Sequence, residues 1–346
     1  MSRSVFLRLR GFGVALTSVL LVVQAGCGAE ERPFQLPTAN RAIYQPGAEG
    51  QYFVGTVGQP WISGTFGCVR SEGWRFHEGL DIRCLQRDER GEPVDPVLAA
   101  ADGRVAYVNA RPSLSNYGNY IVLSHQVDGL EVHTLYAHLG AVQKGLKAGS
   151  KVRRGEVIGT MGRTTDTREP ITRDRAHLHF EMGLLLNPRF AAWQRKNEPK
   201  VRNDHGSWNG RNLAGFDPRA VFLAQRARGA KFNLVGFLRS QPELCRVFVR
   251  AKSFPFLKTY EPLVIRNPRA VGEGIAGYEM ALSFNGLPLR LIPRAASEIK
   301  GAGRMQLLSV NEAEQQRNPA CRLVTQRGGR WELTETGRER LELLLY

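Results

Sequence analysis

The sequence predicts a mainly β fold, with antiparallel strands over the region from about residue 59 to residue 225. Short apolar stretches, such as residues 103–108 and 119–124, are separated by Gly, Asn and Asp residues, which favour turns. No long apolar pattern with a helical period occurs between these stretches. We therefore expect a β-sheet domain there, followed by a smaller α+β domain.

The first 27 residues have the layout of a secretory signal. Basic residues precede an apolar run over residues 14–23, which is too short for a membrane-spanning helix of about 20 residues. Cys27 follows two small residues, as in a bacterial lipobox, although Gln24 stands where an aliphatic residue is usual. We expect export, with a lipid on Cys27 that anchors the protein to a membrane in the periplasm of a diderm bacterium. Plain secretion is the alternative.

The remainder of the chain is long enough for two domains. Residues 28–58 are polar and rich in Pro and Gly, which predicts a tether. The β domain should cover residues 59–225, with an insertion over residues 184–211. Residues 226–346 should form the α+β accessory domain, which includes a hairpin with an Asn-Gly turn at residues 285–286 and a terminal helix.

Three histidine-containing fragments contain the candidate functional residues of the β domain. His77 and Asp81 are four residues apart on an expected strand, so their side chains should share a face. His177 and His179, two residues apart, should also share a face, and His138 follows a strand-like stretch. Neighbouring strands would bring these side chains into one small volume. Nitrogen and oxygen donors with one open position are the ligand set of a catalytic zinc site.

The other three histidines are expected to have structural roles. His125 ends a strand-like run before a polar turn, and His133 has the opposite strand parity to His138. His205 lies in a polar, irregular stretch, and its exclusion has the weakest support.

The chain resembles the lysostaphin/LytM-type zinc metallopeptidases, which cut peptidoglycan cross-links. The resemblance covers residues 61–181, with a weaker extension to about residue 222. It is carried by an ordered series of motifs at residues 62–67, 77–81, 96–105, 117–122, 136–139, 149–159 and 177–181. The resemblance implies a LytM-type peptidase domain with a fold like the duplicated hybrid motif.

The resemblance also implies a role for each site residue. His77, Asp81 and His179 would bind one Zn²⁺ ion, and His138 and His177 would be catalytic. A zinc ion can lower the pKa of a bound water from about 15.7 to about 7. Two imidazoles beside it can transfer protons and stabilise an oxyanion. The sequence leaves open which of the two acts as the base.

Two segments depart from the family pattern. A long polar stretch, residues 165–175, precedes His177 and should border the cleft. Trp74 and Phe76 occupy the region where some members carry a tyrosine that assists the oxyanion, so we expect no such role here. The insertion carries Trp193 and Trp208, and burial is the favoured interpretation for both rather than stacking on sugar rings.

The charge and the motifs together indicate peptidoglycan as the partner. Lys and Arg number 48 against 32 Asp and Glu, which gives a net charge of +16 and favours an anionic partner. No zinc finger, RNA-binding motif or basic helix with interleaved aromatic residues occurs, so nucleic acid is not expected. The leading hypothesis is an exported zinc metalloendopeptidase. The alternative is a non-catalytic LytM-like module that binds the cell wall or activates an amidase.

Export makes disulfides plausible. If Cys27 is lipidated, four cysteines remain, and they allow three pairings. We favour a bridge between Cys68 and Cys84, which flank the first histidine motif, and a second between Cys245 and Cys321. A cysteine zinc site is not expected, because no Cys-x-x-Cys spacing occurs.

Overall fold

The computed structural model describes Met1 and residues 32–346. The predicted signal segment, including Cys27, lies outside the described residues, so the signal and the lipid anchor stay predictions. Within residues 32–346, every helix is too short or too polar to cross a bilayer.

The main sheet is antiparallel, as the sequence predicts, and follows the strand order β12-β11-β7-β6-β5-β9. Strand β3 pairs with the first half of β11, and β12 pairs with its second half. The side chains of β11 are buried along almost its whole length, because other strands flank it on both edges and the core covers its faces. The strands of this sheet are β3 (Leu80–Arg83), β5 (Gly103–Asn109), β6 (Tyr120–Val127), β7 (Leu130–Ala137), β9 (Lys151–Val152), β11 (His177–Leu185) and β12 (Leu213–Phe216).

Smaller elements complete this part of the fold. A second antiparallel sheet contains β4 (Pro96–Leu98), β10 (Val157–Met161) and β8 (Leu139–Val142), and a hairpin contains β1 (Gly67–Arg70) and β2 (Arg75–His77). Helix α2 (Phe190–Asn197) lies in the connection between β11 and β12, and helix α3 (Pro218–Arg228) follows β12. Asp217 caps α3 by accepting a hydrogen bond from the Arg219 N–H, and Pro218 occupies the first turn.

The tether predicted over residues 28–58 is wrong for its described part. Phe34, Tyr52 and Phe53 are almost completely buried in the hydrophobic core. The segment forms helix α1 (Glu49–Tyr52), and the Val54 N–H then donates to the Asp81 carbonyl at 2.9 Å. The prolines and glycines suggested a linker, but the burial of these aromatic side chains stabilises a packed conformation.

The C-terminal region is α+β, as predicted. Its antiparallel sheet follows the order β15-β14-β13-β16, and a separate hairpin pairs β17 with β18. The expected Asn-Gly turn joins β14 to β15, with Gly286 at a φ of +82°. The expected terminal helix is α8, which buries Leu341, Leu343 and Leu344, whereas Leu345 is only partly buried. The elements are α4 (Leu234–Arg239), β13 (Cys245–Val249), α5 (Pro255–Thr259), α6 (Pro268–Glu273), β14 (Gly277–Leu282), β15 (Pro288–Arg294), β16 (Met305–Val310), α7 (Glu312–Arg317), β17 (Val324–Arg327), β18 (Arg330–Leu333) and α8 (Glu335–Leu345).

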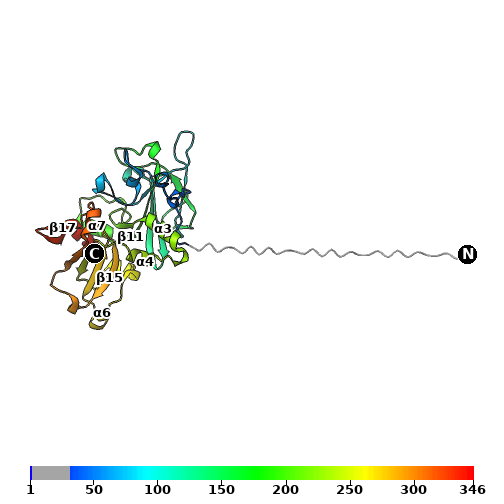
Figure 1. Cartoon of the computed structure of the whole chain (residues 1–346). Helices are drawn as coiled ribbons and strands as arrows, with labels where there is room; N and C mark the ends of the chain where they lie inside the picture. The colour runs from blue at the N-terminus through cyan, green and yellow to red at the C-terminus, as the bar shows by residue number, and fades with distance from the viewer. Residues whose placement is uncertain (2–31) are drawn as a thin grey trace. The chain divides into compact units, whose positions relative to one another are not determined.

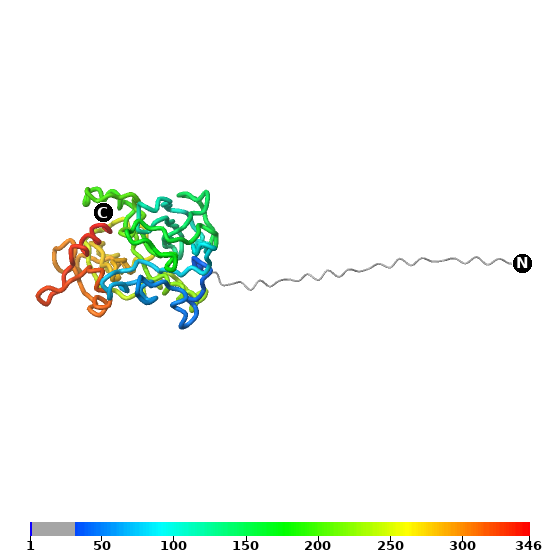
Figure 2. The backbone as a smooth tube through the Cα atoms, turned by 90° about the horizontal axis from the view of Figure 1, so that it is seen from above, coloured from blue at the N-terminus to red at the C-terminus, as the bar shows by residue number. Residues whose placement is uncertain are grey.

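The C-terminal region packs directly against the main sheet. Residues from Arg32 to Tyr346 form one compact unit with a continuous core, and both views show the C-terminal elements beside the main sheet (Figures 1 and 2). The Asn187 side chain donates to the Leu343 carbonyl at 2.6 Å, and the Asn285 side chain donates to the Gly215 carbonyl at 2.8 Å. Helix α3 continues across the boundary expected at residue 226, and the accessory domain as a separate unit stays a prediction.

Candidate metal centre and active site

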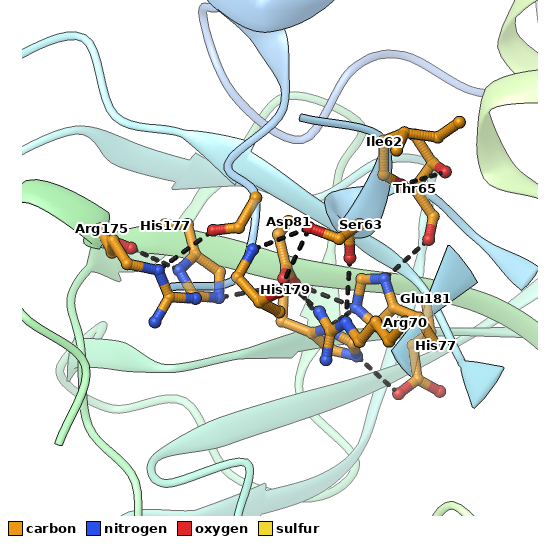
Figure 3. Close-up of polar contacts among 12 residues, drawn as sticks. Ile62, Ser63, Thr65, Arg70, His77, Asp81, Arg175, His177, His179 and Glu181 are labelled. Carbon is orange, nitrogen blue, oxygen red and sulfur yellow. Dashed lines mark hydrogen bonds and ion pairs between the residues drawn. The ribbon is translucent and has the colours of Figure 1, made fainter. Parts of the chain in front are cut away.

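Strand pairing places two of the predicted metal ligands opposite each other. His179 on β11 is the register partner of Asp81 on β3 (Figure 3). On its other edge, His179 pairs with Ala137, the residue before His138. The expected side-by-side arrangement of these strands is therefore confirmed.

His77 reaches the site by a different route from the one the sequence suggests. It ends β2, whereas Asp81 lies on β3, so the two residues do not share one regular strand. The chain bends at Gly79, where an added Cβ atom would lie 2.3 Å from the Phe180 carbonyl oxygen. Only glycine allows this close approach to β11. The bend brings His77 Nε2 to 3.1 Å from Asp81 Oδ1.

Three buried donor atoms converge at this point. The ligand atoms of His77, Asp81 and His179 all lie within 4.8 Å of one another, close enough to hold a metal ion. His179 Nδ1 lies 3.1 Å from His77 Nε2 and 3.0 Å from Asp81 Oδ1. No other group of three such side chains comes this close among residues 32–346.

The outer ring nitrogens of both histidines have fixed partners. His77 Nδ1 lies 2.8 Å from the Thr65 carbonyl oxygen, so it carries the proton and leaves Nε2 free. His179 Nε2 lies 2.9 Å from Glu181 Oε1, which directs Nδ1 toward His77 and Asp81. Tyr117 donates its hydroxyl proton to the same Glu181 oxygen at 2.6 Å. These contacts select the tautomers that metal binding requires, so the donor set fits a divalent cation with nitrogen and oxygen ligands.

The electrostatics of the site favour positive charge beside the two carboxylates. Burial raises the pKa of Asp81, but the adjacent His77 and His177 outweigh it and hold that pKa well below its usual range. Burial lowers the pKa of His179, but its hydrogen bonds to Asp81 and Glu181 raise it to about 10. A metal ion would supply the same positive charge at this position.

His138 lies at a strained junction between β7 and β8. Its φ of +61° is uncommon for a residue with a side chain and marks a place where the surrounding structure determines the backbone. The His138 N–H donates to the Tyr117 carbonyl at 2.8 Å, and His138 Nδ1 lies 2.8 Å from the Thr164 carbonyl oxygen. The ring therefore presents Nε2 as its remaining acceptor.

His177 is held in a similar way at the start of β11. Its Nδ1 lies 2.5 Å from the Arg175 carbonyl oxygen, and its Nε2 lies 3.4 Å from Asp81 Oδ1. The rings of His138 and His177 are 5.0 Å apart between centroids. Burial lowers the pKa of both imidazoles, which keeps them neutral and able to accept a proton at neutral pH.

A cleft of about 740 Å³ opens over these side chains. The polar stretch over residues 165–175 contributes to its wall, as predicted. His205 also lines the cleft, although its Nδ1 bonds the Tyr107 hydroxyl at 2.9 Å and its Nε2 the Leu114 carbonyl at 3.0 Å. His205 therefore belongs to the wall, and the insertion that carries it borders the cleft.

The two remaining histidines lie away from this cleft. His125 bonds the Asp102 carbonyl at 2.8 Å and the Thr134 hydroxyl at 2.7 Å. His133 is buried beside Trp208, with ring centroids 5.2 Å apart. Both positions agree with the expected structural roles, which stay predictions, and the expected burial of the insertion's Trp193 is confirmed.

Sequence reasoning missed three polar residues of the site. Arg70 donates to Asp81 Oδ2 at 2.5 Å and to the Ser63 carbonyl at 2.9 Å. Glu181 and Tyr117 form the hydrogen-bonded pair behind His179. Strand alternation from His179 could have identified Glu181. The sequence carries no comparable signal for Arg70 or Tyr117, because tertiary contacts bring them to the site.

The two expected disulfides are not formed. Cys68, Cys84, Cys245 and Cys321 are all free thiols in the structure. The Cys68 thiol lies beside Cys321, whose contact lowers the pKa of Cys68 to about 7. Local sequence spacing does not reveal that the segment around Cys321 packs beside the β1–β2 hairpin.

Peptidase family M23 matches residues 75–188, the segment that contains all five predicted site residues. The chain contains a peptidase family M23 domain. This is the family to which LytM and lysostaphin belong, so the resemblance seen in the sequence is confirmed.

Two curated relatives of this M23 domain carry different names. Over 118 residues the chain is 36% identical to the DD-carboxypeptidase/endopeptidase Mpg of Neisseria meningitidis serogroup B, a match that covers 33% of this chain and 22% of that protein. Over 127 residues it is 34% identical to the murein hydrolase activator NlpD of Escherichia coli, covering 36% of this chain and 27% of NlpD. The chain thus spans about a quarter or less of the length of these relatives.

Among solved structures, the M23 domain is similar to a zinc-containing peptidase from Vibrio cholerae. The sequences are 29% identical, the TM-score is 0.26, and the match covers 38% of this chain and 36% of the other.

Proposed function

We propose that this protein is an exported zinc metalloendopeptidase that hydrolyses peptide bonds in peptidoglycan stems or cross-links. The observation that carries the proposal is the complete set of donor atoms in His77, Asp81 and His179, each buried and each with its hydrogen-bond partner. The M23 match over residues 75–188 and the named endopeptidase among the relatives support the same assignment.

His77 Nε2, Asp81 Oδ1 and His179 Nδ1 would hold the zinc ion. Bound there, zinc would supply Lewis acidity toward a water molecule and the scissile carbonyl. Thr65 and Glu181 fix the two ring orientations, so the donors need no rearrangement to bind the ion.

His138 and His177 carry the proton transfers in this proposal. The carbonyl oxygens of Thr164 and Arg175 hold their Nδ1–H groups and direct the two Nε2 atoms to the cleft. A neutral imidazole can accept a proton from the attacking water and return it to the leaving amine. The protonated ring can also donate a hydrogen bond to the tetrahedral oxyanion.

One observation favours a second candidate, a non-enzymatic activator of a cell-wall hydrolase. The relative NlpD is named a murein hydrolase activator and is about as similar to this chain as Mpg is. The intact triad and the two anchored histidines support the enzyme over this candidate, because an activator needs no metal site.

Muropeptide analysis tests the proposal. Isolated sacculi are incubated with the full-length protein, with and without a zinc chelator, and the products are identified by mass spectrometry. Chelator-sensitive loss of cross-linked dimers is the expected result and identifies the bond that is cut. Unchanged muropeptides with zinc-loaded protein would contradict the enzyme and favour the activator.

Two variants make this test specific. His179→Ala removes a metal ligand and should abolish the products. His133→Gln changes a buried histidine away from the cleft and should retain them, provided that its circular dichroism spectrum is that of the wild type. Equal activity of the wild type and His179→Ala would mean that a contaminating hydrolase produced the signal.

A further inference from the structure

The segment around Cys321 is packed onto the β1–β2 hairpin of the M23 domain. The backbone N–H groups of Ala320 and Cys321 lie near the Cys68 sulfur and lower its pKa. The two thiols also act on each other, since their contact lowers the pKa of Cys68 and raises that of Cys321. Cys68 lies on β1, directly opposite Phe76 of β2. The two thiols therefore meet where the C-terminal region joins the metal site's hairpin.

Other contacts hold this segment in place on both sides of Cys321. Arg322 places its guanidinium carbon 5.9 Å from the centre of the Trp74 ring. An added Cβ at Gly73 would lie 3.8 Å from Pro319 Cγ, so these backbones are close. Phe76 and Cys321 also line a common cavity of about 240 Å³. The thiol contact thus belongs to an interface several residues long.

We infer that Cys68 and Cys321 are a disulfide pair, which fastens residues 319–322 to the β1–β2 hairpin. This inference is independent of the proposed function, since it depends on the two sulfur atoms and not on the metal. The bond would close a loop that contains most of the chain, and long loops are those in which a cross-link restricts the unfolded chain most.

The other two cysteines have environments that do not favour a bridge. Cys245 is 1% exposed, and burial raises its pKa to about 12. Cys84 is buried, and the charged groups that act on it are Arg87, Asp95 and Arg83, with no thiol among them. Cys68 differs, because its contact with Cys321 lowers its pKa to about 7. It is therefore the thiol most readily ionised for exchange.

Bridge formation needs a disulfide as the oxidant, such as oxidised glutathione or a protein disulfide carrier. The Cys68 thiolate attacks one sulfur of the oxidant, breaks its S–S bond and releases one thiol. Cys321 then loses its proton and attacks the Cys68 sulfur of the mixed disulfide, which releases the second thiol. Two thiols of the protein are oxidised to one disulfide, and one disulfide of the oxidant is reduced to two thiols.

Peptide mapping tests the pair directly, because trypsin places each of the four cysteines on a different peptide. The full chain is reduced, incubated with oxidised glutathione, alkylated in denaturant and digested without reduction. The expected product links residues 42–70 to residues 318–322. A link from residues 42–70 to residues 84–87, or alkylation of both Cys68 and Cys321, would overturn the inference.

Matched variants and a melting experiment complete the test. Cys321→Ser should leave Cys68 fully alkylated, whereas Cys245→Ser should retain the link. Oxidation should raise Tm by about 5 °C in the wild type and leave it unchanged in Cys321→Ser. An equal rise in both proteins would show that the stabilisation comes from a different bond and would contradict the inferred role of this pair.

Discussion

His179 and the His138–His177 pair differ in what holds their side chains. Side-chain carboxylates surround His179, which contacts both Asp81 and Glu181. Backbone carbonyls alone anchor the outer nitrogens of His138 and His177. The first arrangement stabilises positive charge, and the second leaves neutral imidazoles that can gain and lose a proton. The proposed function assigns His77, Asp81 and His179 to a metal-binding set and His138 and His177 to a proton-transfer set, and the environment of His179 differs accordingly from those of His138 and His177.

Removal of a triad ligand should have the largest effect. His179→Ala should lose both bound zinc and cleavage, because two ligands do not retain the ion. Zinc content by elemental analysis and muropeptide release measure the two losses on the same sample. Cleavage by metal-free His179→Ala protein would mean that the assignment of His179 as an essential metal ligand is wrong.

The proton-transfer set should respond differently. His138→Ala should keep its zinc while turnover falls about 10²-fold or more, as expected when a general acid–base group is lost. The same two assays distinguish the outcomes. Loss of zinc from this variant would mean that His138 is a ligand and that the assignment of the two sets is wrong.

Weakening the hydrogen bond between Glu181 and His179 should have a smaller effect. In Glu181→Gln the partner of His179 Nε2 becomes neutral, so the imidazole becomes a weaker base. Zinc affinity should fall roughly 10- to 100-fold, measured by competition with a fluorescent chelator.

Glu131 offers a matched control for this change. It is a partly exposed carboxylate that lies 3.6 Å from His133, away from the cleft. Glu131→Gln should bind zinc with the affinity of the wild type. If both variants lose affinity equally, the loss reflects general destabilisation and not the hydrogen bond to His179.

The sequence predicted which residues come together better than it predicted their geometry. The spacing of His177 and His179 required only that β11 be a strand, and the expectation held. His77 and Asp81 were placed on one strand, but the bend at Gly79 depends on the backbone of β11, which local spacing does not reveal. The positive φ of His138 likewise arises from long-range contacts.

Long-range packing also explains which predictions from the sequence were wrong. The segment before residue 58 has the composition of a linker, but Phe34 and Tyr52 are buried in a core that other segments build. Phe284 in the C-terminal region packs beside Phe66 and Phe76, with ring centroids 5.9 and 5.7 Å apart. Neither contact has a counterpart in local sequence spacing, and the position of Cys321 beside Cys68 was missed for the same reason.

His125 is a buried histidine without a carboxylate partner, in contrast to His179. Its protonation should have the smallest of the predicted effects. Burial lowers the pKa of His125, the hydrogen bond to the Asp102 carbonyl opposes this shift, and the nearby His133 adds to it, so that the resulting pKa is about 4. The folded pKa lies below the unfolded value of about 6.5, so the unfolded chain binds more protons at intermediate pH. The contribution of His125 to stability is complete above pH 6.5 and is lost as the pH falls toward 4.

Urea unfolding at several pH values measures this loss. Between pH 7 and pH 5 the free energy of unfolding should fall by about 2 kcal/mol on account of His125. In His125→Gln, which cannot be protonated, this part of the slope should disappear. A slope that is unchanged in the variant would assign the acid sensitivity to other groups. The effect of burial on the pKa of His125 could then no longer be contrasted with the effect of the two carboxylates on the pKa of His179.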